Sequence, residues 1–152
     1  MKAKFKIIIF IYMLLASCGY KVLDKASTNN YEIKDIKITG DVRTNYKIKN
    51  HILINSKKNA ATIVNLAINT KISKSVKEKN IKNEITKYNL TLNANISIYN
   101  IETPKTIELN FSLIDEYSVG NNYLTTINNE KSAKQKLAKK ASDLIIKKIN
   151  NL

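Results

Sequence analysis

The sequence contains little of what small enzymes, metal proteins and disulfide-bonded domains depend on. It has one cysteine, one histidine, one proline and three glycines among 152 residues, and no tryptophan. A lone cysteine excludes a disulfide scaffold, and a lone histidine leaves few ligands for a transition metal. The scarcity of glycine and proline excludes collagen-like and proline-rich chains. With 43% hydrophobic and 25% charged residues, the chain has enough apolar material for one folded core.

The N-terminus has the pattern of an export signal. Three lysines precede an apolar run at residues 7–16, which ends at Ser17-Cys18-Gly19. A charged segment, an apolar segment and a boundary of small residues are typical of a secretory signal peptide, here residues 1–17. Ten residues of helix rise only about 15 Å, half of the roughly 30 Å hydrocarbon core of a bilayer. The run therefore favours a cleaved signal, with an uncleaved signal anchor as the alternative.

The end of this signal, Leu15-Ala16-Ser17-Cys18, resembles a bacterial lipobox. The resemblance implies a diacylglycerol thioether on Cys18 and an acyl chain on its amine. We therefore expect no cofactor other than this covalent lipid. Two or more chains hold a protein stably on a bilayer, whereas one chain is marginal. Gly19 stands where an aspartate would suggest retention in the inner membrane. The predicted location is therefore the periplasmic side of the cell outer membrane.

The charge is strongly positive, with 26 Lys and Arg residues against 12 Asp and Glu residues and a net charge of +14. Cleavage before Cys18 would remove 17 residues and three lysines, leaving 135 residues and a net charge of +11. A small basic protein usually suggests a nucleic-acid partner. An exported lipoprotein does not meet nucleic acid, so that partner is excluded and the expected acidic partner is lipid.

The mature chain begins with a polar segment, residues 18–30, which we interpret as a lipidated tether to a single domain at residues 31–152. Residues 31–40 have the β-branched content of a strand, but their apolar alternation slips by one residue near Lys34-Asp35, which predicts a β-bulge. Residues 42–54 then have apolar positions at helical spacing, with Asp41 placed to cap the helix.

Three strands follow, each with one apolar and one polar face. The expected connections are residues 77–83, which are lysine-rich, and a tight turn at residues 103–105. The buried positions are expected to be Val64, Leu66, Ile68, Ile72 and Val76 in the first strand, Tyr88, Leu90, Leu92, Ala94, Ile96 and Ile98 in the second, and Ile107, Leu109, Phe111, Leu113, Tyr117 and Val119 in the third.

A helical apolar stripe runs from Ala133 to Leu152, with Asn128 or Asn129 as the expected cap and Glu130 in the first turn. The element order is therefore β-α-β-β-β-α. It predicts an α+β two-layer sandwich, a four-stranded mixed sheet covered on one face by two helices. The first strand should lie parallel to the second through a right-handed crossover, at an edge that the pattern leaves open.

The sequence offers no reactive centre. Asp115 and Glu116 are the only adjacent carboxylates, and in an alternating strand they point to opposite faces. His51 has no second histidine, cysteine or carboxylate pair to work with, which favours a surface or boundary position. A nucleophile elbow, a P-loop and metal-ligand spacing are all missing. We expect a non-enzymatic protein with no catalytic and no metal-binding residues.

A group of lysines offers a binding surface instead. Lys71, Lys74, Lys77, Lys79 and Lys82 gather where the first long hairpin turns. One interpretation is an ordinary solvated hairpin end, and the other is a set of point charges for phosphates.

A few apolar residues fall outside the predicted core of the second strand. Ile85, Tyr99 and Ile101 lie near the ends of that strand, on its polar face. Gathered among Asn, Ser and Thr side chains, they would fit a surface that contacts another protein.

The whole arrangement resembles the lipopolysaccharide-assembly lipoprotein family LptE. The features that match are the lipobox ending in Cys18 with residues 19–23, the strand ending in Gly40, the helix after it, the long polar-alternating strands and the alanine-containing helix of residues 133–149. The resemblance covers nearly the whole chain, although only its N-terminal part is a motif and the remainder is order and spacing. The near absence of Arg and the Asn-rich strands depart from many relatives.

The resemblance implies a lipoprotein that plugs the outer-membrane barrel LptD, helps it assemble and assists lipopolysaccharide insertion into the outer leaflet. Lipopolysaccharide would then be the ligand of the five hairpin lysines. Two other classes stay open: a generic lipid-anchored envelope protein with a basic surface for anionic lipid, and a periplasmic module that binds a soluble ligand.

Overall fold

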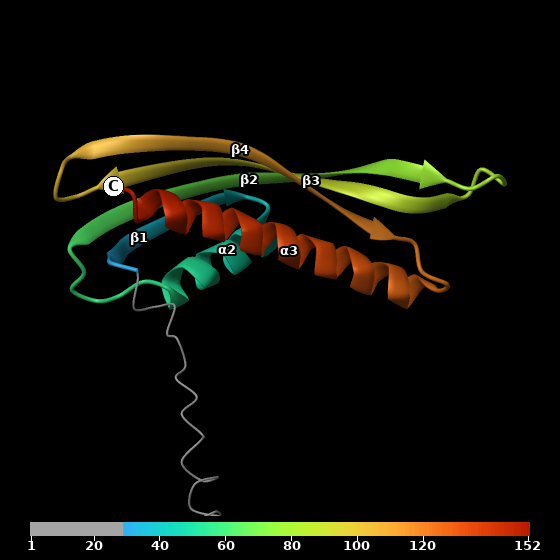
Figure 1. Ribbon diagram of the computed structural model, residues 1–152, viewed down its shortest axis with the longest axis horizontal. Helices are drawn as coiled ribbons and strands as arrows, with labels where there is room; N and C mark the ends of the chain where they lie inside the picture. Colours follow the sequence, from blue (N-terminus) through green and yellow to red (C-terminus); the bar gives the residue numbers. More distant parts are fainter. Residues whose placement is uncertain (1–28) are drawn as a thin grey trace, which may run out of the picture.

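The structure is a computed structural model that describes residues 29–152. The predictions for the signal peptide, for lipidation of Cys18 and for most of the tether lie outside these residues. The elements are β1 (Tyr31–Gly40), α2 (Val42–Ile54), β2 (Thr62–Lys79), β3 (Ile85–Asn100), β4 (Lys105–Ser118) and α3 (Tyr123–Ile149). Their order and the two-layer α+β architecture confirm the predicted fold class (Figure 1).

The sheet is mixed, with strand order β1-β2-β3-β4. β1 pairs parallel to β2, as predicted, and it takes the edge beside β2 that the sequence left open. The register between these strands shifts between Ile33 and Asp35, which confirms the bulge. The bulge restores the alternation, so that Ile36 and Ile38 return to the apolar face opposite Leu66 and Ile68.

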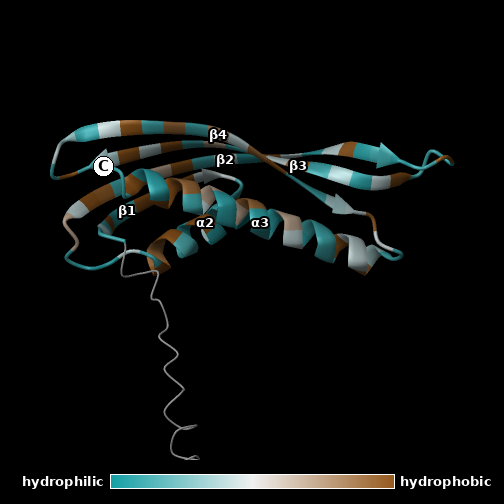
Figure 2. Ribbon diagram, viewed as in Figure 1, coloured by the Kyte–Doolittle hydropathy of each residue, from teal (hydrophilic) through white to brown (hydrophobic). Residues whose placement is uncertain are grey.

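Both helices lie against the same face of the sheet, and the strands alternate between apolar and polar residues along their length (Figures 1 and 2). The core lies between these two layers. Its fully buried members include Leu66, Ile68, Leu92, Ile96 and Ile98 from the sheet, Ile48 and Ile52 from α2, and Leu137, Ala141 and Ile145 from α3. Each helix has a single apolar stripe, and that stripe is removed from water only when the helix packs against the sheet.

The junction between β1 and α2 is fixed by backbone geometry and by the predicted cap. Gly40 has φ +88°, and a Cβ atom there would overlap the Thr70 carbonyl oxygen, so only glycine fits. The next residue, Asp41, donates its backbone N–H to that Thr70 oxygen at 2.9 Å. Its carboxylate accepts from the Thr44 N–H at 2.8 Å, which confirms Asp41 as the N-cap. The chain therefore turns sharply and enters the helix directly above β2.

Two element boundaries differ from the prediction. α3 is capped by Asn122, whose side chain accepts from the Thr125 N–H at 2.8 Å, and not by Asn128 or Asn129. The first turns of α3 bury no side chain, so the buried apolar stripe begins only at Ala133. β2 likewise continues to Lys79, and the predicted core position Val76 is 46% exposed, outside the core. Val119, at 38% exposure, lies just after the end of β4 and is also outside the core.

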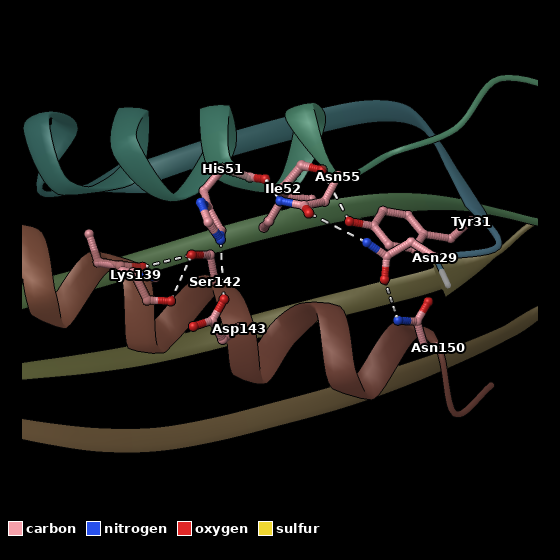
Figure 3. Close-up of polar contacts among 10 residues, drawn as sticks. Asn29, Tyr31, His51, Ile52, Asn55, Lys139, Ser142, Asp143 and Asn150 are labelled. Atoms are coloured by element: carbon pink, nitrogen blue, oxygen red, sulfur yellow. Dashed lines mark hydrogen bonds and ion pairs between the residues drawn. The ribbon is translucent and has the colours of Figure 1, made fainter. Parts of the chain in front are cut away.

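Polar contacts tie the chain entry to the ends of both helices (Figure 3). The fully buried Tyr31 hydroxyl donates to the Ile52 carbonyl at 3.1 Å, and burial raises the pKa of Tyr31 so that the donor stays protonated. Asn150, at the end of α3, donates to the Asn29 side chain at 2.8 Å. Residue 29 therefore enters the domain at the end where α2 and α3 both finish.

The assignment of the two sheet faces is testable at neighbouring positions. Leu92 is fully buried, whereas Asn93 is exposed on the opposite face. We expect Leu92→Asp to abolish cooperative unfolding, because an unpaired buried carboxylate costs about as much as the whole 5–15 kcal/mol of a typical domain. Asn93→Asp should change the free energy of unfolding by less than about 1 kcal/mol. Urea denaturation followed by circular dichroism measures both, and equal loss of stability would contradict the assignment.

Candidate functional site

The hairpin formed by β2 and β3 projects beyond β4 and beyond the first turn of α3 (Figure 1). Its turn is ordered by Asn80, whose side-chain oxygen accepts from the N–H groups of Lys82 and Glu84 at 2.9 and 3.0 Å. Asn83 takes φ 65°, a left-handed conformation that asparagine tolerates well. Ile81 at the tip is fully exposed. The projection is thus a defined structure that carries its own turn contacts.

The five lysines proposed as a cluster occupy four different environments. Lys71 lies on the exposed sheet face opposite Asn93, roughly 26 Å along the strand from Lys79. Lys77 sits at a register shift and forms an ion pair with Glu116 of β4. Lys79 and Lys82 are exposed at the turn, where Lys79 donates to Asn83 at 2.9 Å. The structure therefore brings only the last two together at the tip.

Lys74 belongs to the opposite, helix-facing side of the sheet. Its ammonium lies 4.0 Å from the ring centroid of Tyr88 and 5.2 Å from that of Tyr117, two rings that stack on each other. The same ammonium is 3.2 Å from a carboxylate oxygen of Glu130 on α3. Lys74 thus holds the base of the projecting hairpin against the helix layer, and its charge is already matched.

Glu130 is the centre of this network, a role that the sequence did not reveal. It accepts from the Lys134 ammonium and, at 2.9 Å, from the Tyr117 hydroxyl, in addition to its pair with Lys74. The Lys134 ammonium, followed by these other donors, lowers the pKa of Glu130 to about 2. The Tyr117 hydroxyl and the Glu130 carboxylate in turn raise the pKa of Lys74. The partners come from β2, β4 and α3, so no local sequence pattern could have identified the group.

The uncovered face of the sheet is mainly polar. The exposed side chains there include Asn69, Asn93, Asn95, Asn110 and Ser112. Asn95 and Asn110 lie directly opposite each other at the centre of the face.

Two exposed apolar groups interrupt this polar face, Tyr99 at 39% and Ile114 at 64% exposure. Ile85 and Ile101, which the sequence placed beside Tyr99 as surface groups, are half-buried. An apolar contact surface near the strand ends is therefore smaller than the sequence suggested.

Glu116 of the acidic pair and His51 each form an ionic contact with another side chain. Glu116 pairs with Lys77, whereas Asp115 shares the alternation of Leu113 and Tyr117, so the two carboxylates do point to opposite faces. His51 is half-buried, which agrees with the predicted surface or boundary position. Its imidazole lies 3.1 Å from a carboxylate oxygen of Asp143 on α3, a contact that the sequence did not predict (Figure 3).

In residues 29–152 no three His, Cys, Asp or Glu side chains gather where they could hold a metal ion. Within the same part of the chain, no helix has the length and apolarity needed to cross a membrane.

The Glu130 network predicts a specific pH dependence. A carboxylate whose pKa is lower in the folded chain stabilises the fold above its unfolded pKa, and this stabilisation is lost as the pH falls through the folded value. We expect Glu130→Gln to lower the free energy of unfolding by roughly 1–3 kcal/mol at neutral pH and to flatten the stability profile between pH values of about 4.5 and 2.

The measurement is urea denaturation at a series of pH values. Glu108→Gln is the matched control, because Glu108 is exposed on β4 and forms no ion pair among the described residues. Superimposable pH profiles for wild type and Glu130→Gln would contradict the network.

Neither a protein-family model nor a curated protein sequence matches the chain. Solved structures do match. Rare lipoprotein B from Shewanella oneidensis aligns with a TM-score of 0.56 and 7% identity, covering 77% of this chain and 94% of its own. A lipoprotein from Caulobacter crescentus aligns with a TM-score of 0.50 and 11% identity, covering 76% of this chain and 88% of its own. The chain therefore shares the fold of these two bacterial lipoproteins.

Proposed function

We propose that this chain is an outer-membrane lipoprotein, anchored through Cys18 on the periplasmic side, that plugs the LptD barrel and helps it assemble. The observation that carries the proposal is a sheet with one uncovered, mainly polar face. Soluble two-layer domains commonly expose such a face to water. The interior of an outer-membrane barrel is polar as well, so amide and hydroxyl side chains would suit its wall.

The projecting hairpin supports the same proposal. A plug has to reach along the lumen of its barrel, and β2 and β3 extend past every other element of the described domain (Figure 1). The lipid anchor that the lipobox predicts would hold the domain at the inner leaflet, beside the periplasmic opening of a barrel. The shared fold with rare lipoprotein B is consistent with a lipid-anchored envelope protein.

The ligand in this proposal is lipopolysaccharide, bound through its phosphates. Of the five lysines, Lys71, Lys79 and Lys82 have ammonium groups that pair with no carboxylate in the described residues. Lys77 and Lys74 are matched by Glu116 and Glu130. The first three lysines are therefore the ones that we propose as phosphate contacts, each worth about 1 kcal/mol near an anionic surface.

Co-purification tests the barrel. The full-length protein, extracted from outer membranes in non-ionic detergent, should bring down one large barrel in equal amount. Asn95→Trp with Asn110→Trp adds bulk at the centre of the polar face and should reduce recovery of the barrel. Lys139→Trp with Lys140→Trp adds the same bulk on exposed positions of α3 and should leave it unchanged. Lipoprotein recovered without a barrel would exclude the plug and favour a membrane-binding or ligand-binding module.

The lysine contacts are tested separately. Replacing Lys71, Lys79 and Lys82 with Gln should weaken lipopolysaccharide binding roughly tenfold or more at fixed salt, since three screened charges are lost. The control replaces Lys136, Lys139 and Lys140 on α3, which removes the same charge elsewhere. Equal affinities for wild type and the hairpin variant, measured by light scattering with lipopolysaccharide of known concentration, would remove these residues from the site.

A further inference from the structure

A groove opens in the helix layer where the first turns of α2 run beside the first half of α3. Its volume is about 580 Å³, which lies within the 300–1,000 Å³ that small-molecule sites typically enclose. Three apolar side chains line it and are nevertheless exposed, Val42 at 69%, Tyr46 at 60% and Ile127 at 42%. The core does not use these side chains, so the groove is an apolar surface without a partner in the described domain.

The apolar surface continues along α3 toward its N-terminus. Tyr123 is 76% exposed and Leu124 is 71% exposed. Both precede Ile127 by three or four residues, the spacing that places side chains on one side of a helix. Together with Ile127, these residues form an exposed apolar strip that reaches the N-terminal end of α3. A contiguous apolar strip of this kind is unusual on a soluble surface and typically marks a binding site.

Basic side chains rim the groove. Arg43 and Lys47 come from α2, and Lys131 and Lys134 come from α3. Lys134 is paired with Glu130, but the other three cations form no ion pair within residues 29–152. Burial, and then the positive charges of Lys131 and Lys134, lower the pKa of Lys47. Like charges are thus held close together, and an anion between them would relieve their repulsion.

The two acidic residues at the groove do not supply that anion. The carboxylate of Asp41 caps α2 by accepting from the Thr44 N–H. The carboxylate of Glu130 is shared among Lys134, Lys74 and Tyr117. The net field at the rim is therefore positive, while the floor is apolar.

An apolar floor with a cationic rim complements a molecule that joins a hydrocarbon chain to a negative headgroup. A second copy of this chain is a poor occupant, because the same basic rim and the positive net charge, +11 for the predicted mature chain, would repel it. A folded protein partner is also a poor fit, because ten residues line the groove whereas a stable interface uses about 20–30 on each side. We propose that the groove binds one acyl chain of an anionic phospholipid, with the phosphate between Lys47 and Lys131.

This lipid site goes beyond the proposed barrel function and does not depend on it. The groove belongs to the helix layer, whereas the polar sheet face and Lys71 lie on the other side of the sheet. Occupation by a membrane phospholipid would hold the α2 side of the domain against the leaflet and would leave the polar sheet face free.

Photolabelling tests the site in the full-length protein. The protein is reconstituted into phosphatidylcholine vesicles that contain a trace of phosphatidylglycerol carrying a diazirine on one acyl chain. After irradiation, mass spectrometry of peptides should locate the label at Tyr46 and at Ile127. Phosphatidylcholine with the same photoreactive chain should label these positions about tenfold less, because its headgroup has no net charge to meet the basic rim.

Matched variants separate the groove from general membrane contact. Lys47→Gln with Lys131→Gln should reduce phosphatidylglycerol labelling about tenfold, whereas Lys139→Gln with Lys140→Gln, which removes equal charge from the same helix layer, should leave it within twofold. Ile127→Asn should also reduce labelling, whereas Leu144→Asn should not. Ile127 and Leu144 are 42% and 40% exposed on the same helix, so neither substitution disturbs the core.

Three results would overturn the lipid site: equal labelling by both lipids, label spread evenly over α3, or equal loss in the charge variant and its control. Protection of Tyr46 by a co-purified protein or by lipopolysaccharide, with no effect of phosphatidylglycerol, would also overturn it in favour of that other occupant. Circular dichroism and the melting temperature of each variant confirm that a loss of labelling reflects the groove and not the fold. Because no barrel is present in the vesicles, failure here leaves the plug proposal standing.

Discussion

The one-sided apolar character of the sheet is the constraint on which the rest of the molecule depends. Four strands place their aliphatic side chains on one face, and a sheet of this kind is stable only when that face is removed from water. α2 and α3 supply the cover, and each buries its own stripe in doing so. The polar face is left uncovered, and the domain therefore presents one wide hydrogen-bonding surface as a direct consequence of how its core is made.

The limits of that cover explain the less regular parts of the structure. Beyond Ile72, the side chains of β2 are exposed, and the apolar alternation fades. At this margin aliphatic packing is replaced by the network of Lys74, Tyr88, Tyr117 and Glu130. The Lys74 ammonium lies over the two stacked tyrosine rings and pairs with the Glu130 carboxylate. It thereby joins β2 to α3 at a place where a purely hydrophobic contact would be half exposed.

The domain therefore has three chemically distinct surfaces. The sheet face offers mainly amides and hydroxyls, the hairpin tip offers lysines around an exposed Ile81, and the helix layer offers an apolar groove with a basic rim. These surfaces lie on different sides of a single small fold and share few residues. In that arrangement the domain could contact a polar wall, a phosphate-bearing ligand and a membrane lipid at the same time, because each would use different side chains.

Local pattern alone determined the number, order and type of the elements, the cap at Asp41, the bulge after Ile33 and the buried side of each strand, because each follows from spacing or from a neighbouring residue. The pattern did not predict the start of α3 at Tyr123 or the end of β2 at Lys79. These segments bury no apolar side chains, so their sequences show no regular apolar spacing. The hairpin lysines are close in sequence, but the alternation of the strand places them on different faces of the sheet. Lys74 instead pairs with Glu130, which is 56 residues away in the sequence. The groove forms only when tertiary packing places α2 beside α3, because the residues that line it come from two segments far apart in the sequence.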